Sequence, residues 1–210
     1  MNKPCRILLF AKAPIPGKAK TRLIPALGAR GAGALQAALL RHTLTTVAQT
    51  RLECELWCHP DSAHPVFSAL AREFGVSLHV QTGNDLGRRM GYAAGADRHR
   101  PAILIGADCP SLTAWDLREA ALALEADQDA VLGPALDGGY YLLGLRQTHP
   151  SLFEGISWGE HRVLAETRAR LRILGWRWRE LSARRDIDRP DDLPSLAAYP
   201  HLETLIRAFT

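Results

Sequence analysis

The stretch that decides the fold is "AILIGADCPSLTAWDLREAALALEA", residues 102–126. It opens with a short uncharged apolar run, 102–107, which is typical of a strand buried on both faces of a sheet. A turn follows, and Thr113 then stands where the N-cap of a helix is expected. Apolar residues at helical spacing continue to residue 126. The stretch therefore predicts a strand, an acidic turn and a helix in succession, which is the unit of an α/β fold.

The same alternation extends in both directions from this unit. Besides 102–107, we expect strands at 5–11, 53–59, 76–81, 130–134, 140–146 and 176–181. Helices are expected at 30–49, 62–75, up to about residue 98, 113–126 and 159–174, with short helices at the C-terminus. Such alternation predicts a mostly parallel sheet with helices on both faces. We find no repeat and no linker, so residues 1–210 are expected to form one domain.

Composition narrows the class of protein. Apolar content is 47% and charged content 23%, which are ordinary values for globular proteins. No apolar run approaches the ~20 residues that span a bilayer, and the N-terminus lacks the features of a signal peptide. We expect a cytoplasmic protein with no membrane partner. The four cysteines, which include Cys54 and Cys58 on one strand face, fit no zinc spacing and are expected to be buried thiols.

The net charge of +4 could suggest nucleic acid as a partner. Most basic residues, however, are arginines scattered among acids. The one dense patch, 166–185, is expected to be an amphipathic helix followed by a strand, and it contains no nucleic-acid-binding motif. We therefore expect no nucleic acid partner.

The loop "AKAPIPGKAKTRL", residues 11–23, contains three of the four lysines of the chain. In an open α/β sheet, ligands bind beyond the carboxyl ends of the strands, and this loop follows the first strand. Lysine meets phosphate as a compact point charge, and glycine allows close approach of the backbone. The loop is predicted to bind phosphate through Lys12, Gly17, Lys18, Lys20 and Arg22; the alternative is a solvated basic loop.

Two known phosphate motifs are excluded. A P-loop needs a glycine where Lys12 stands and a hydroxyl side chain where Ala19 stands. The stretch "GARGAG", residues 28–33, does not have the glycine order of the dinucleotide-binding fingerprint. The chain is therefore expected to be neither a P-loop NTPase nor a Rossmann dehydrogenase.

Carboxylates follow the later strands. Asp108 comes directly after the strand 102–107, and Asp186 and Asp188 lie two residues apart in "RRDIDRPDDL". Two carboxylates on one side of an extended segment suit Mg²⁺ or Mn²⁺, which would bridge phosphate oxygens. The alternatives are a structural cap at Asp108 and, for the later cluster, a helix entry in which Asp191 and Asp192 start a helix after Pro190.

Two further turns contribute candidate residues. In "ALDGG", Asp137 is a candidate acceptor-side base, and Gly138 and Gly139 could let a ligand approach the backbone; the alternative is a hairpin turn. In "QTGNDLGRRM", residues 81–90, Asp85 and Arg89 could reach the same edge of the sheet.

Taken together, "FAKAPIPGKAKTRL", "DLGRRM", "IGADCPSL", "LGPALDGGYYLLGL" and "DIDRPDDL" resemble, in order, a family of small GT-A-like transferases of the nucleotide-diphospho-sugar transferase superfamily. This family was long catalogued as a domain of unknown function, and its members are named as arsenosugar-type glycosyltransferases associated with radical-SAM enzymes. The chain is more distantly similar to guanylyltransferases of deazaflavin and molybdenum cofactor synthesis. The resemblance implies a three-layer α/β/α GT-A sandwich with one reversed strand near residues 138–145.

For activity, the resemblance implies a metal-dependent glycosyltransferase that uses a nucleotide sugar and a small-molecule acceptor. Lys12, Lys20 and Arg22 would then neutralise the diphosphate, and Asp108, Asp186 and Asp188 would hold Mg²⁺ or Mn²⁺. The first alternative is a nucleotidyltransferase acting on an NTP, although the first loop lacks the GxGxRxxxxK spacing of those enzymes. The second is a non-catalytic sugar-nucleotide-binding module.

The chain departs from the family where "WGEHRV" replaces the usual Ser-Thr after a tryptophan, which leaves the roles of Glu160 and His161 open. The nucleobase, the sugar, the acceptor, the stereochemical outcome and the oligomeric state also stay open.

Overall fold

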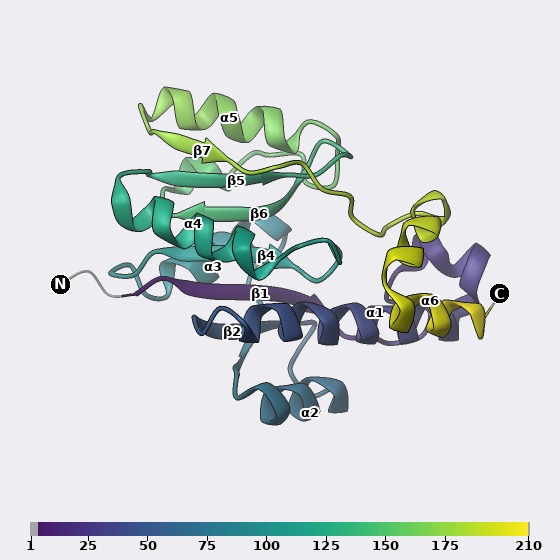
Figure 1. Ribbon diagram of the computed structural model, residues 1–210. Coiled ribbons are helices and arrows are strands. Elements are labelled where there is room, and N and C mark those ends of the chain that lie inside the picture. Colours follow the sequence, from purple (N-terminus) through teal and green to yellow (C-terminus); the bar gives the residue numbers. More distant parts are fainter. Residues whose placement is uncertain (1–3, 210) are drawn as a thin grey trace.

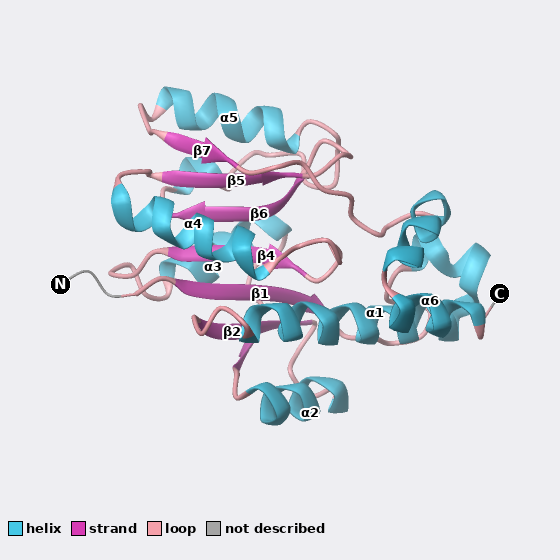
Figure 2. Cartoon of the chain, viewed as in Figure 1, coloured by secondary structure: helices cyan, strands magenta, loops and turns pink. Residues whose placement is uncertain are grey.

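A computed structural model describes residues 4–209. Its centre is a seven-stranded sheet in the order β3-β2-β1-β4-β6-β5-β7 (Figures 1 and 2). The strands are β1 Arg6–Lys12, β2 Glu53–His59, β3 Ser77–Val80, β4 Ala102–Gly106, β5 Ala130–Pro134, β6 Tyr140–Leu145 and β7 Trp178–Glu180. Every strand expected from the sequence is present, and the bounds of β2 and β5 agree at both ends.

One strand runs against the others. β6 is antiparallel to both of its neighbours, β4 and β5, whereas all other pairs are parallel. The reason is the short connection between β5 and β6, since a tight turn can join only antiparallel strands. The expected fold class, a mostly parallel α/β sheet with one reversed strand near residues 138–145, is confirmed.

Helices cover both faces of the sheet (Figure 1). Helices α1, α2 and α4 pack on one face, while α3 and α5 pack on the other. The α-helices are α1 Ile24–Ala48, α2 Pro65–Phe74, α3 Leu86–Gly95, α4 Ala114–Ala126, α5 Val163–Ile173 and α6 Pro200–Arg207, and three 3-10 segments are η1 Thr21–Leu23, η2 Pro150–Leu152 and η3 Pro190–Ala198.

Strand residues divide between the two faces with a period of two, as the pleat requires. In β1, Ile7 and Leu9 face the core under α1, α2 and α4, whereas Leu8 faces the core under α3 and α5. Cys54 and Cys58 of β2 share the first of these cores, and the four cysteines are free and buried. The expectation of buried thiols is confirmed.

Helix α1 begins six residues earlier than expected, because Pro25 occupies its first turn and Gly28 (φ 68°, ψ 168°) joins two helical pieces across a kink. In the described part of the chain, Thr21–Ala48 is one segment with the length and mean hydropathy, 1.3, of a membrane-spanning helix. The sequence had predicted no such run. Half of this segment is buried inside the protein, so packing accounts for its apolar composition.

A third core cluster lies beyond the end of the sheet. It joins the first half of α1 to η3 and α6, with Leu27 and Leu35 on one side and Leu196 and Leu202 on the other. Ile187, which is fully buried, belongs to the same cluster. Figure 1 shows this C-terminal segment packed on α1, near the edge where β1 and β4 end.

The N-cap of α4 is Thr113, as expected. Thr113 and Asp116 form a capping box, and Arg184 reaches Asp116 at 2.7–2.8 Å from the segment after β7. Burial raises the pKa of Asp116, but hydrogen bonds from Arg184 and Thr113 outweigh it, so the pKa lies below its usual value. This pair ties the late turn of the chain to α4.

Candidate functional site

The expected loops meet at one edge of the sheet. Strands β1, β2, β3 and β4 are parallel neighbours, so the loops after them lie side by side at their carboxyl ends. A cleft of about 540 Å³ opens there, and we call it the cationic cleft. Its charged lining residues are Lys12, Lys20, Arg22, Arg89, Asp108 and Asp188. The end of β1 and the loop after it supply three of its four cations, and α3 supplies the fourth, Arg89.

His59, the last residue of β2, lies in the wall of the cationic cleft and responds to its charges. Burial lowers the pKa of His59, and the neighbouring charges of Arg89 and Lys12 lower it further. A second proton on this imidazole is disfavoured because the cleft is already positive. The positive lining of the cleft suits an anion.

Two of the cations are already paired with carboxylates. The Lys20 ammonium lies 2.8 Å from Asp108 Oδ1 and also donates to the carbonyl of Ile187. Its side chain is only 3% exposed. Arg22 pairs with Asp188 in a more exposed position. The first loop is thus bound directly to both acidic turns.

The backbone of Lys20 is also unusual. It has φ 48° and ψ 43°, a left-handed conformation that non-glycine residues seldom adopt. Such a conformation persists where surrounding contacts hold it. Here those contacts are the ones to Asp108 and Ile187. Lys20 therefore fixes the loop, while Lys12 and Arg89 extend into the cleft without an ion pair among the described residues.

Some predicted residues lie outside the cationic cleft. Gly17 (φ 80°) and Lys18 are exposed on the far part of the loop and do not line it. Asp85 is the N-cap of α3, where its carboxylate accepts from the Arg88 N–H at 2.8 Å. Its neighbour on the next turn, Arg89, does line the cleft. The acidic residue of this motif is thus accounted for by the helix start.

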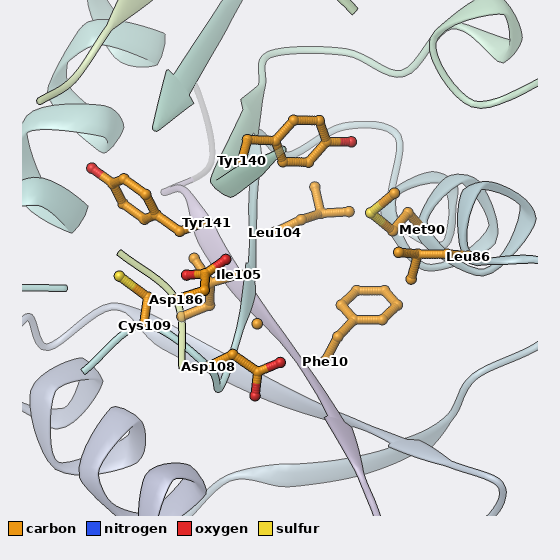
Figure 3. A pocket seen from close by; sticks show the side chains of 11 residues that line it. Phe10, Leu86, Met90, Leu104, Ile105, Asp108, Cys109, Tyr140, Tyr141 and Asp186 are labelled. Carbon is orange, nitrogen blue, oxygen red and sulfur yellow. The ribbon is translucent and has the colours of Figure 1, made fainter. Parts of the chain in front are cut away.

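Asp186 is the most perturbed carboxyl group of the site. Burial raises its pKa to about 7, and the nearby charges of Asp108 and Asp137 contribute to the rise. Figure 3 shows its carboxylate beside Cys109, with Asp108 on the neighbouring segment. Within residues 4–209, its Oδ1 atom is buried without a hydrogen-bond partner. An acceptor left in this state is what a bound cation would satisfy.

These groups fit a hard divalent cation in their chemistry. Carboxylate oxygens are the ligands that Mg²⁺ and Mn²⁺ prefer. In the described region, however, no three His, Cys, Asp or Glu side chains stand together as a ready ligand set. The reason is that Asp108 and Asp188 face Lys20 and Arg22 instead of Asp186. Asp186 is therefore the available ligand, and Asp108 and Asp188 would have to leave Lys20 and Arg22 to join it.

A second cleft, of about 480 Å³, lies on the other side of the acidic turns. We call it the acidic cleft, because its wall contains Asp137, Glu160, Asp186, Asp188 and Asp192. His161 and three arginines, Arg22, Arg185 and Arg189, complete its charged lining. The candidate base Asp137 therefore lines the same cleft as Asp186 and Asp188. Glu160 and His161, whose roles the sequence left open, line it too.

Gly138 and Gly139, predicted to let a ligand approach the backbone, contact other parts of the protein in the β5–β6 turn. Asp137 accepts from the Gly139 N–H at 2.9 Å, which makes the turn typical of a hairpin. A Cβ on Gly138 (φ 92°) would lie 2.1 Å from the carbonyl oxygen of His161. Gly138 O also accepts from the Leu164 N–H at 3.0 Å. Gly138 thus admits the backbone of the 159–161 segment, where the sequence had predicted a ligand.

Several lining residues were not predicted. His59 and Gln81 line the cationic cleft, and both directly end or follow strands, so the strand-end rule could have found them. The Gln81 amide is fixed by the carbonyls of Trp57, at 2.8 Å, and Ala11. Arg189 of the acidic cleft lies among several acids and gave no separate signal.

Comparisons with solved structures find this fold elsewhere. A protein from Desulfovibrio desulfuricans G20, provisionally named a nucleotide-diphospho-sugar transferase, shares 29% identity with a TM-score of 0.82; the match covers 98% of this chain and 97% of the other. A cytidylyltransferase from Leptospira borgpetersenii shares 15% identity with a TM-score of 0.63, over 97% and 92% of the chains.

Glucosyl-3-phosphoglycerate synthase from Mycobacterium tuberculosis, in complex with Mn²⁺, UDP and glucosyl-3-phosphoglycerate, shares 10% identity with a TM-score of 0.57. That match covers 98% of this chain and 76% of the synthase. The first two of these three names are those of transferases, as expected for this chain.

A comparison with curated proteins finds no match. A family model described as "Uncharacterized protein conserved in bacteria (DUF2064)" matches residues 42–160, more than half of the sequence. The GT-A-like nucleotide-diphospho-sugar transferase fold implied by the resemblance is confirmed. The chain belongs to the DUF2064 family.

Proposed function

We propose that the protein transfers a sugar from a nucleoside diphosphate sugar to a hydroxyl group of a small acceptor. The observation that supports this most is the cationic cleft, about 540 Å³ in volume, whose wall contains four cations and the carboxylates Asp108 and Asp188. Lys12 and Arg89 would bind the diphosphate by charge-assisted hydrogen bonds. Arg22 would join them on release from Asp188.

In the transfer, the acceptor oxygen attacks the anomeric carbon and forms the new glycosidic bond. The bond between that carbon and the β-phosphate oxygen breaks, and the nucleoside diphosphate leaves with the electron pair. The proton of the acceptor hydroxyl passes to a base in the acidic cleft, for which Asp137 is the candidate. The cations of the first loop stabilise the leaving diphosphate, whose charge grows in the transition state.

We further propose that Mg²⁺ or Mn²⁺ takes part, held by Asp108 and Asp186, with Asp188 as a third ligand. A bound divalent ion would neutralise charge on the departing diphosphate. Support comes from the buried, unpartnered Oδ1 of Asp186 and from the raised pKa of the same carboxyl group. The Mn²⁺ and UDP in the related synthase are consistent with this chemistry.

Nucleotidyl transfer to a phosphorylated acceptor would use the same cations and carboxylates. Two features favour the sugar donor. The first loop lacks the glycine spacing with which nucleotidyltransferases surround a triphosphate, and Gly17 and Lys18 lie away from the cleft. The Desulfovibrio desulfuricans protein, with 29% identity to this chain, is also named as a nucleotide-sugar enzyme.

The test measures the group that leaves. Nucleoside diphosphate sugars of several bases, with Mn²⁺, should stabilise the protein more than the matching NTPs; at ~100 times Kd the gain is about 2.7 kcal/mol. Nucleoside diphosphate should then be released slowly by transfer to water. Pyrophosphate release from an NTP and a phosphorylated acceptor, without diphosphate release from any sugar donor, would establish nucleotidyl transfer instead.

Asp108→Ala tests the metal, and its free energy of unfolding is measured beside binding, because the variant also removes the ion pair of the buried Lys20 ammonium. Mn²⁺-dependent nucleotide binding, measured by calorimetry, should be lost in this variant. Asp191→Ala is the matched control, since Asp191 is exposed and lines neither cleft. Unchanged Mn²⁺-dependent binding in Asp108→Ala would show that the metal site lies elsewhere.

A further inference from the structure

An apolar cavity of about 210 Å³ adjoins the two clefts and is distinct from both. Figure 3 shows Asp108 and Asp186 on one side of it, with Phe10, Leu86 and Met90 on the other. Its remaining lining residues are Leu104, Ile105, Gly106, Cys109, Tyr140 and Tyr141. The cavity thus places an apolar surface directly beside the carboxylates of the site.

Gly106 is the residue that keeps this space open. A Cβ at this position would meet only the Asp108 backbone nitrogen, at 4.0 Å, so no protein atom requires a glycine here. Gly106 is also the last residue of β4 and has no positive φ, so backbone conformation does not require one either. It borders both the apolar cavity and the cationic cleft. A glycine in this position leaves room for a substrate group.

The lining decides what kind of group fits. The edges of a nucleobase or the hydroxyls of a sugar need hydrogen-bond partners, and each buried group left without one costs about 1–3 kcal/mol. The Tyr141 hydroxyl already donates to Ser182 O at 3.1 Å, and the Cys109 thiol is a weak donor. Among the described residues, two lining groups keep an unpartnered polar atom, the Tyr140 hydroxyl and Asp186 Oδ1. A ligand with one or two polar atoms on an apolar body suits this lining better than a polyhydroxylated one.

The volume of the cavity limits which apolar groups it can hold. A cavity of about 150 Å³ is enough for a benzene ring, so this one can hold a ring or a branched alkyl group. The nucleotide would occupy the cationic cleft and the sugar hydroxyls would find partners in the acidic cleft. The apolar cavity is then left for the acceptor.

We propose that the acceptor is an amphipathic alcohol or phenol, whose ring or branched alkyl group occupies the cavity lined by Phe10, Met90, Leu104 and Gly106. Its hydroxyl lies at the end of the cavity at Asp186, a residue that the cavity shares with the acidic cleft in which Asp137 lies. This inference rests on the proposed glycosyl transfer for the identity of the molecule as an acceptor. The cavity itself can be tested by binding alone.

The experiment follows the binding of benzyl alcohol by saturation-transfer NMR, with and without a nucleoside diphosphate and Mn²⁺. Glycerol, which has hydroxyls but no apolar group, is the control ligand. Gly106→Val fills the cavity from the sheet, and Met90→Phe fills it from α3. Gly95→Val is the matched control variant, since a Cβ there meets nothing within 4 Å and Gly95 lies away from the site.

Wild type and Gly95→Val should bind benzyl alcohol but not glycerol, and both cavity variants should bind it about tenfold more weakly or worse. Unchanged binding in a folded cavity variant, equal binding of glycerol, or no binding of benzyl alcohol to wild type would overturn the proposal. If wild type binds benzyl alcohol but no nucleoside diphosphate, the cavity stands and the proposed glycosyl transfer fails. If wild type binds a nucleoside diphosphate but not benzyl alcohol, the cavity proposal fails and the proposed glycosyl transfer is unaffected.

Discussion

Replacing Lys20 by methionine should lower the free energy of unfolding more than it lowers the affinity for any ligand. Methionine keeps much of the volume of the side chain but removes the ammonium, which lies 2.8 Å from Asp108 Oδ1 and also donates to Ile187 O. A hydrogen bond to a charged group contributes about 1.5–3 kcal/mol, and a buried carbonyl left unpaired costs about 1–3 kcal/mol. The Asp108 side chain is 46% exposed, so water would replace part of the lost ion pair.

These contributions together give an expected loss of about 2–4 kcal/mol in the free energy of unfolding. For a chain of this length, that corresponds to a fall in Tm of roughly 5–15 °C. The assay is urea denaturation followed by circular dichroism, with Lys12→Met as the control. Lys12 is exposed at the end of β1, so its variant should stay within about 0.5 kcal/mol of wild type.

For ligand affinity the order of the two variants should be reversed, with the larger loss in Lys12→Met. Lys12→Met should weaken a nucleoside diphosphate much more than the corresponding nucleoside, because Lys12 lines the cleft without an ion pair among the described residues. If Lys20→Met were as stable as wild type and its main effect were on diphosphate affinity, Lys20 would be a free phosphate ligand. The structural reading of its contacts would then be refuted.

Three further predictions follow from single contacts. Arg89→Ala should weaken nucleoside diphosphate binding about 10- to 150-fold by calorimetry, whereas Arg88→Ala, outside the cleft, should not. Asp116→Asn should cost about 2–3 kcal/mol in the free energy of unfolding at pH 7, because it leaves the partly buried Arg184 without its charged partner. The pKa of Asp116 is lowered in the folded state, so this difference from wild type should be complete above about pH 4 and shrink as the pH falls further, in denaturation curves across pH. Gly138→Ala should lower Tm and disturb the acidic cleft, because its Cβ would overlap His161 O; Gly139→Ala, whose Cβ meets only a carboxylate oxygen at 3.3 Å, should change Tm much less.

The strands were predictable because their signals are local. A buried apolar run flanked by turn residues identifies a strand wherever it lies in the chain, and β2 and β5 agree with the prediction at both ends. The start of α1 was missed by six residues, because Gly28 interrupts the helical pattern at a kink and Pro25 suits its first turn. The reversed strand came from the family resemblance, and the short turn before Tyr140 explains it physically.

The location of the site was predictable for a related reason, since the ends of parallel strands share an edge of the sheet. Which residues pair with one another inside the site was not predictable. Lys20 contacts Ile187 across 167 positions of the sequence, and no pattern within the first loop announces that partner. Asp186 lies in a polar stretch, so its burial could not be read from composition. That burial depends on Ile187, the one apolar residue between the two aspartates.

Ile187 has a consequence that reaches beyond its own contacts. Its N–H donates to Asp108 O at 2.8 Å, its carbonyl accepts from Lys20, and its side chain is buried against α1 and the C-terminal helices. A ligand that orders the carboxylates on either side of it must also favour the docked state of η3 and α6. By thermodynamic reciprocity, opening of the C-terminal helices and ligand affinity are then linked quantities. Amide hydrogen exchange in α6 should therefore slow when the cleft is filled, far from any atom that the ligand touches.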